Sequence, residues 1–291
     1  MSSTKHTFSL YYKLTKPGIV RGNAIHTLAG ALFAAIWIPD WLGIIGVLVG
    51  TSLVIASACV VNNYIDRKID VKMKRTKERA SVTGKIPLRS GMIFASILLL
   101  LGFLTLIVLT NWLVVLIGIV AYLTYVLAYT LSKPHTTYST LIGAIPGALP
   151  AMAGYVAVDG QLSVGAWCIF LLIAVWQIPH FYAISIFRKD EYKAAGVPVL
   201  GVVKPFQVVK THIFFYQVMY LLVVVAMITF DVVVPAAGLL LLLGAAYWLY
   251  VYAFTKGSEI KWSKSIFGAS LVLTLLLPLA GLLNMFLNVP L

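Results

Sequence analysis

The chain has 291 residues, of which 61% are hydrophobic and only 11% are charged. This composition excludes an ordinary soluble domain, which would carry far more charge. Apolar stretches of about 20 residues recur along the sequence, and each is long enough to cross a bilayer. Because a backbone surrounded by lipid must satisfy its own hydrogen bonds, we expect these stretches to be helices. The predicted fold class is an all-α, polytopic membrane protein.

The formal net charge of +13 raises the question of nucleic-acid binding. However, the basic residues are distributed over the loops that flank the apolar stretches, and they do not form a recognisable nucleic-acid-binding module. Membrane topology and anionic lipid headgroups account for most of this charge. We therefore expect contact with membrane lipid and no nucleic-acid partner.

We expect nine transmembrane helices within a single domain, residues 1–291. In chain order their approximate ranges are 22–38, 42–64, 90–109, 112–131, 138–158, 164–187, 211–230, 232–254 and 266–287. The links between these spans are short and contain no low-complexity tract or polar linker at which a second domain would begin.

The loops alternate sharply in charge. All 22 Lys and Arg residues lie in the amino-terminal segment or in every second loop. The opposite loops contain Asp40, Asp159 and Asp231 but no basic residue. Because cytoplasmic loops carry an excess of Lys and Arg, the amino terminus is predicted to be cytoplasmic. With nine spans the carboxyl terminus, 288–291, would lie on the far side of the cell (inner) membrane.

A line of polar residues follows the second predicted span. Asn62, Asp66 and Asp70 are spaced by four residues, so on a continuous helix they would lie along one stripe. Carboxylate and amide oxygens suit Mg²⁺, which usually binds through a few carboxylates plus the phosphates of a substrate. Arg75 and Arg79 follow at the same spacing, on a helical stripe of their own, and guanidinium groups fit phosphate oxygens. Together these residues predict a Mg²⁺-dependent diphosphate site.

Charged helices beside a membrane also have a simpler interpretation, in which they hold the topology and bind lipid headgroups. That interpretation suffices for the other basic residues of this loop, which are Arg67, Lys68, Lys72, Lys74 and Lys77. It does not explain the aligned carboxylates, because these gain little beside an anionic surface. We therefore assign Asn62, Asp66 and Asp70 to the site.

A second acidic pair, Asp190 and Glu191, follows the sixth predicted span and is preceded by Arg188 and Lys189. It comes after the sixth span as the first cluster comes after the second, which suggests two related halves whose acidic loops face each other. Carboxylates of both loops would then hold two or more Mg²⁺ ions on a diphosphate, with Arg188 and Lys189 as further diphosphate ligands. The alternative is that these are ordinary solvated charges.

His180 lies in an apolar run, directly after Pro179 and near the cytoplasmic end of the sixth span. Ionisable residues at such depth usually have a function. A neutral imidazole there would coordinate iron, move a proton or bond a carbonyl freed by the proline, and the sequence leaves these roles open. Cys59 and Cys168 lack metal-ligand spacing, so we interpret them as small buried apolar residues.

These motifs together resemble a known family. The pattern Asn62-x-x-x-Asp66-x-x-x-Asp70, with a second acidic loop after the sixth span, is similar to the UbiA superfamily of intramembrane prenyltransferases. Within it, the haem O synthases, or protohaem IX farnesyltransferases, resemble the chain at Met73-Lys74-Arg75-Thr76-x-x-Arg79 and Trp176-Gln177-x-Pro179-His180. Two positions depart from that pattern. Ala80 replaces a frequent proline and Glu191 an expected aspartate, so either Asp190 or Glu191 would face the metal.

The resemblance implies transfer of the farnesyl group of farnesyl diphosphate to a vinyl group of haem B, with addition of water, to give haem O and diphosphate. It implies Mg²⁺ as cofactor and a haem–copper oxidase as a partner in the pathway. The implied catalytic residues are Asn62, Asp66, Asp70, Arg75, Arg79 and His180. Diphosphate would contact Arg75, Arg79, Arg188 and Lys189, and the metal Asp66, Asp70, Asp190 and Glu191.

Two alternatives stay open from the sequence. A related prenyltransferase acting on an aromatic acid or a quinone precursor would keep both acidic loops. A membrane transporter is the more distant alternative, because transporters usually place ionisable groups near the middle of the membrane. Here the charged residues cluster at one face and mark no path across.

Overall fold

The computed structural model describes residues 2–37 and 39–288, so most of the carboxyl-terminal segment 288–291 lies outside the described residues. Within these ranges the chain forms helices and no strand, which confirms the all-α prediction. Eight helices are long and apolar enough to cross a membrane. They are α3 (Trp41–Ile65), α6 (Leu88–Leu109), the combined helix Trp112–Ser132, α9 (Ser139–Asp159), α10 (Val164–Phe187), α13 (Phe206–Thr229), α14 (Pro235–Phe254) and α15 (Glu259–Leu287).

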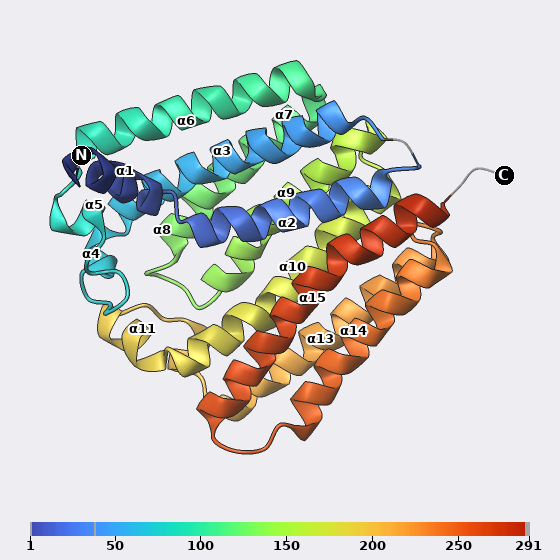
Figure 1. Ribbon diagram of the computed structural model, residues 1–291. Helices are drawn as coiled ribbons and strands as arrows, with labels where there is room; N and C mark the ends of the chain where they lie inside the picture. Colours follow the sequence, from blue (N-terminus) through green and yellow to red (C-terminus); the bar gives the residue numbers. More distant parts are fainter. Residues whose placement is uncertain (1, 38, 289–291) are drawn as a thin grey trace.

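The first predicted span, 22–38, corresponds to α2 (Pro17–Ala34), which is not among those eight helices. It begins earlier than expected, at Pro17. Proline favours the first helical position because its fixed φ angle is helical, and because an N–H at that position would have no partner within the helix. α2 nevertheless packs against α3, α9 and α15, and it runs among the long helices of the bundle (Figure 1). The count of nine spans stays a prediction.

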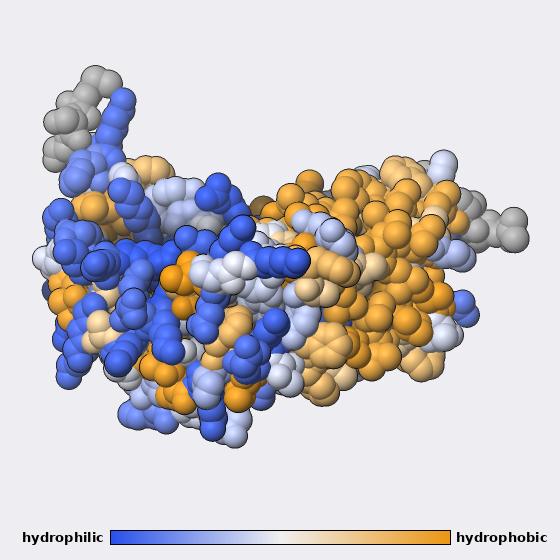
Figure 2. Space-filling model, turned by 90° about the horizontal axis from the view of Figure 1, so that it is seen from below, coloured by the Kyte–Doolittle hydropathy of each residue, from blue (hydrophilic) through white to orange (hydrophobic). Residues whose placement is uncertain are grey.

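Short helices gather at one end of the bundle. They are α1 (Ser2–Leu14), α4 (Arg67–Asp70), α5 (Ala80–Thr83) and α11 (Lys189–Ala195), and all lie at the left of Figure 1. Figure 2, which keeps left and right, shows hydrophilic residues over this polar end and hydrophobic residues over much of the rest. The basic loops of the sequence therefore meet at one end of the molecule, which is the arrangement that the alternation of charge predicts.

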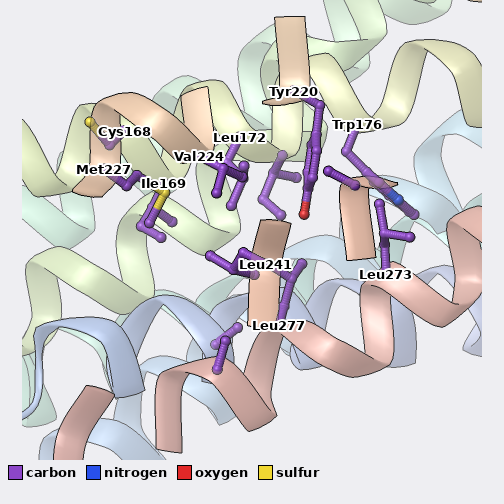
Figure 3. Close-up of a cluster of buried hydrophobic side chains, with 14 of the residues drawn as sticks. Cys168, Ile169, Leu172, Trp176, Tyr220, Val224, Met227, Leu241, Leu273 and Leu277 are labelled. Atoms are coloured by element: carbon purple, nitrogen blue, oxygen red, sulfur yellow. The ribbon is translucent and has the colours of Figure 1, made fainter. Parts of the chain in front are cut away.

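The largest group of buried side chains lies where α10, α13, α14 and α15 meet. Leu172, Val224, Leu241 and Leu273, one from each helix, come together there (Figure 3). Hydrogen bonds add to this packing, because the Trp176 indole N–H on α10 donates to a main-chain carbonyl oxygen of α15 at 3.0 Å. Lipid is as apolar as leucine, so close packing and such bonds hold membrane helices together.

Glycines bring α2 and α9 close to each other. A Cβ added at Gly30 of α2 would overlap the carbonyl oxygen of Ala151, and one added at Gly154 of α9 would overlap that of Thr27. Small residues at a helix crossing allow backbones to approach in this way. The crossing fixes α2, and with it the chain that precedes α2, against α9.

We expect the substitution Gly154→Val to destabilise the bundle, because its side chain has to push apart the backbones of two packed helices. Overpacking of this kind costs roughly 1–3 kcal/mol, and the apparent Tm in detergent should fall accordingly. Gly22→Ala, at a half-buried position of α2 with nothing within 4 Å of an added Cβ, is the control and should not lower the Tm. An unchanged Tm for Gly154→Val would contradict the close crossing.

Candidate active site

A cavity of about 750 Å³ begins at the polar end and extends between the long helices. This volume is within the range of small-molecule sites. Its polar mouth is formed by Lys16, Asn62, Asp66, Asp70, Arg75, Arg79, Lys133, Arg188 and Lys264. Its interior is mostly apolar and aromatic, and includes Val54, Ile55, Ala58, Tyr122, Tyr125, Pro146, Phe181, Ile184 and Phe267.

The structure brings Asn62, Asp66 and Asp70 together at the polar mouth. α3 ends at Ile65, but the Asp66 N–H donates to the Asn62 carbonyl oxygen and the Asp70 N–H to that of Asp66, both at 2.8 Å. The helical path therefore continues from α3 into α4, which keeps the three side chains on one stripe. All three residues are no more than 2% exposed.

Both buried carboxylates have a basic partner. Lys133 Nζ donates to Asp66 Oδ2 at 2.7 Å, and Arg79 Nη1 donates to Asp70 Oδ2 at 2.5 Å. Asn62 completes the group, since its Nδ2 donates to Asp66 Oδ2 at 3.2 Å and its Oδ1 accepts from Lys16 Nζ. A buried carboxylate without a partner would be strongly destabilising, so the folded chain depends on these contacts. Three cations thus surround two carboxylates and one amide.

The sequence did not identify Lys16 and Lys133 as site residues. Lys16 is 46 residues from Asn62 and Lys133 is 67 residues from Asp66, so no local spacing connects them. One signal for Lys133 was available, because it is the only Lys or Arg between the fourth and fifth predicted spans. Lys16 has a left-handed backbone, with φ of 51°, which is uncommon for any residue other than glycine. Such outliers often mark functional positions.

A π-helical turn, η1 (Thr124–Tyr129), interrupts the helix Trp112–Ser132 beside the acidic stripe. Thr130 Oγ1 donates to the Tyr125 carbonyl oxygen at 2.8 Å and accepts from Asn62 Nδ2 at 2.9 Å. Turns of this kind are rare and frequently lie at functional sites. Here the turn lets Tyr125 and Tyr129 line the cavity while Lys133, one turn on, reaches Asp66.

Arg75 and Arg79 both line the cavity, but the expectation that they share a helical stripe is wrong. Residues 71–79 form successive turns in place of a helix. Thr76 Oγ1 donates to the Asp70 carbonyl oxygen at 2.8 Å, and a local bond of this kind competes with the hydrogen bonds of a helix. The chain folds back on itself at this point, which is how Arg79 reaches Asp70.

The two acidic loops contact each other, as the sequence suggested. Ile69 and Met73 of the first loop pack against Ala195, Val197 and Val199 of the second. This apolar contact closes one side of the polar mouth.

The acidic pair of the second loop lies apart from the acidic stripe. Asp190 and Lys189 are exposed and do not line the cavity. Glu191 Oε1 accepts from Arg188 Nη1 at 3.1 Å, and Arg188 itself lines the cavity. Among the described residues, no group of three His, Cys, Asp or Glu side chains is arranged to hold a metal ion.

The carboxylates of Asp66 and Asp70 fit Mg²⁺ by their chemistry. They are hard oxygen donors, and Mg²⁺ commonly takes one or two carboxylates and completes its shell with water and phosphate oxygens. Within the described part of the chain, each of the two aspartates accepts its side-chain hydrogen bonds through Oδ2. The Oδ1 atom of each therefore stays available to a metal ion. Arg75, Lys16 and the two ion-paired cations lie at the same mouth and suit the phosphates.

His180 lies one side chain away from the cavity. Its Nδ1 is 2.8 Å from Ser270 Oγ, and that hydroxyl donates its single hydrogen to the Phe267 carbonyl oxygen at 2.6 Å. His180 Nδ1 must therefore be the donor, so a neutral ring has no proton on Nε2. The ring stacks on Trp176 and lies 4.8 Å from the ring of Phe267, which does line the cavity.

The two cysteines behave as the sequence predicts. Cys59 and Cys168 are both free and buried.

Comparison with curated proteins gives consistent matches. A protoheme IX farnesyltransferase of Yersinia pseudotuberculosis is 41% identical over 270 residues, which cover 90% of each chain. The protein of the same name from Pectobacterium atrosepticum is 46% identical over 211 residues, or 72% of this chain and 71% of the relative.

Comparison with solved structures shows the same fold at low sequence identity. A structure of digeranylgeranylglyceryl phosphate synthase has a TM-score of 0.78 at 17% identity and covers 96% of this chain and 99% of its own. A UbiA homolog from Archaeoglobus fulgidus bound to GPP and Mg²⁺ has a TM-score of 0.75 at 15% identity, with coverage of 95% and 99%. The sequence profile of the UbiA prenyltransferase family matches residues 23–286. The chain therefore belongs to the UbiA prenyltransferase family.

Proposed function

We propose that this protein transfers the farnesyl group of farnesyl diphosphate to a vinyl group of haem B, with addition of water, and so forms haem O and diphosphate. The observation that carries the proposal is the pair of buried, ion-paired carboxylates, Asp66 and Asp70, at the mouth of an apolar cavity. Relatives that are 38–46% identical and named protoheme IX farnesyltransferase support haem as the acceptor.

Binding of the diphosphate falls to the basic residues of the polar mouth. Lys16, Arg79 and Lys133 already lie at the acidic stripe, and Arg75 lines the same mouth. Asp66 and Asp70 would hold Mg²⁺, which when bound supplies positive charge to the leaving diphosphate. As the allylic carbon–oxygen bond breaks, Arg75, Arg79 and the two lysines stabilise the negative charge that grows on the leaving group. The Archaeoglobus homolog bound to GPP and Mg²⁺ supports a metal-dependent prenyltransferase.

The interior of the cavity suits the farnesyl chain and the cation that remains on it. Val54, Ile55 and Ala58 offer an apolar surface beside the acidic stripe. Tyr125 and Tyr129 present aromatic rings to the same space, and ring faces stabilise a nearby positive charge. Exclusion of bulk water keeps the cation from premature hydrolysis.

The acceptor reaction then follows from the chemistry of the vinyl group. The terminal vinyl carbon bonds to C1 of the farnesyl group, and the positive charge moves to the carbon attached to the macrocycle. Water adds to that carbon and loses one proton, which gives the hydroxyl group of the product. Water has to enter from the polar mouth, because the interior is mostly apolar.

We further infer that the polar end faces the cytoplasm and that the protein lies in the cell membrane. All 22 Lys and Arg residues are in the amino-terminal segment or in every second loop, and cytoplasmic loops carry this excess. Both substrates are amphiphilic, so they reach the cavity from the bilayer surface at which its charged mouth would lie.

Asp66→Asn and Asp70→Asn should each lower the rate of haem O formation by at least about 100-fold, because each removes a carboxylate that would hold the metal against the leaving group. The assay uses purified protein with haem B, farnesyl diphosphate and Mg²⁺, and mass spectrometry detects haem that has gained one farnesyl group and one water.

Asp231→Asn is the control for these two variants. Asp231 is an exposed aspartate at the opposite end of the bundle, and asparagine tolerates its left-handed backbone. Its rate should equal that of the wild type. Full haem O formation by both Asp66→Asn and Asp70→Asn would refute the assigned roles, whereas a prenylated aromatic acid in place of haem O would refute the acceptor.

The affinity for farnesyl diphosphate should fall as the pH rises above about 8. Burial lowers the pKa of Lys16 to about 8, so the residue is charged below that pH and neutral above it. A bound diphosphate favours the charged lysine, so binding becomes weaker, by at most about tenfold per pH unit, once the free protein has lost this proton.

KM for farnesyl diphosphate, measured from pH 7 to 9.5, checks this expectation. Lys16→Met should have a KM about tenfold higher at pH 7 and should lack the rise that begins near pH 8. A wild-type KM that stays constant over this range, or an identical rise in Lys16→Met, would contradict the role of Lys16.

A further inference from the structure

A second basic pair lies on another wall of the polar mouth. Lys264 belongs to α15 and Arg188 to the junction of α10 and α11, and both line the cavity. In Figure 1 the beginning of α15 lies well away from the junction of α3 and α4, where the acidic stripe is. The mouth therefore has two separate positive regions.

Aromatic rings connect the two members of this pair. The Arg188 guanidinium lies 5.7 Å from the centre of the Phe187 ring, and that ring is 5.7 Å from the ring of Phe267. Lys264 is three residues before Phe267 on the same helix, so their side chains share a face. We call these four residues the aromatic wall; it offers two cations beside two aromatic rings whose planes meet at 74°.

The two positive regions differ in what they already bind. At the acidic stripe, Arg79 and Lys133 are paired with carboxylates and Lys16 with an amide. On the aromatic wall, Arg188 is held by Glu191 through one of its five N–H donors, and Lys264 has no hydrogen-bond or ion-pair partner among the described residues. The aromatic wall thus has N–H donors that are available to an anionic ligand. It has no carboxylate that would hold a metal.

We propose that Lys264 and Arg188 bind the two propionate carboxylates of the haem acceptor, while Phe187 and Phe267 pack against its macrocycle. This inference rests on the proposed function. Lys264 is exposed and Arg188 is half-buried, so both suit carboxylates that stay near water. The face of one phenyl ring and the edge of the other suit a flat apolar macrocycle. Haem B carries its propionates on one edge and its vinyl groups on the opposite part of the ring. Anchoring at the aromatic wall therefore directs the vinyl groups across the cavity toward Asp66 and Asp70, where the allylic cation forms.

The test compares haem B with its dimethyl ester, which lacks both negative charges. Binding is followed by the shift of the haem absorption band on titration of the purified protein, and KM is measured for each substrate. Lys264→Gln should weaken haem B binding roughly five- to tenfold, as should Arg188→Gln, and should leave KM for farnesyl diphosphate within about twofold. The wild type should bind the ester less tightly than haem B, and Lys264→Gln should discriminate less between the two.

Lys261→Gln is the matched control, because Lys261 lies one turn before Lys264 on α15, is exposed, and does not line the cavity. Unchanged haem B binding in both Lys264→Gln and Arg188→Gln would overturn the inference. So would a raised KM for farnesyl diphosphate with unchanged haem binding, because the pair would then belong to the diphosphate. If the wild type itself neither binds haem B nor forms haem O, the proposed function fails, and this inference fails with it.

Discussion

Two carboxylates buried at the end of one membrane helix determine how the rest of the site is built. Asp66 and Asp70 are each 2% exposed, and charges at such a position need partners of opposite sign. Those partners come from distant parts of the chain: Lys133 from beyond the π-helical turn, Arg79 from a folded-back loop, and Lys16, through Asn62, from the turn before α2. The acidic stripe thereby specifies the arrangement of four segments.

The membrane accounts for the division of the cavity into a charged mouth and an apolar interior. Helices in lipid expose apolar side chains along their length, so charge is confined to their ends. The reaction uses both environments. A diphosphate needs cations and a metal at the water-facing end, whereas a farnesyl cation needs a space from which bulk water is excluded. A cavity that crosses from one environment to the other satisfies both requirements within one bundle.

The sequence predicted the parts of the site that depend on local spacing. Asn62, Asp66 and Asp70 were found because a helical period places them on one stripe, and eight of the predicted spans match apolar helices because hydropathy is a local property. The prediction that Arg75 and Arg79 share a helical stripe was wrong because the chain turns after Asp70, whose carbonyl oxygen accepts from the Thr76 hydroxyl and from the Met73 N–H. Lys16, Lys133 and the π-helical turn were missed because their roles arise from tertiary contacts over tens of residues.

The proposed reaction depends on Asp66 and Asp70 holding the metal that binds the diphosphate. The most direct measurement is a crystal structure with Mn²⁺ in place of Mg²⁺ and an unreactive thiolo analogue of farnesyl diphosphate, in which anomalous scattering locates the metal. We predict a peak within coordination distance of the carboxylates of Asp66 and Asp70, with the analogue's phosphates against Arg75, Arg79, Lys133 and Lys16. A metal bound only beside Asp190 and Glu191, or phosphates bound at Lys264 and Arg188, would contradict the account.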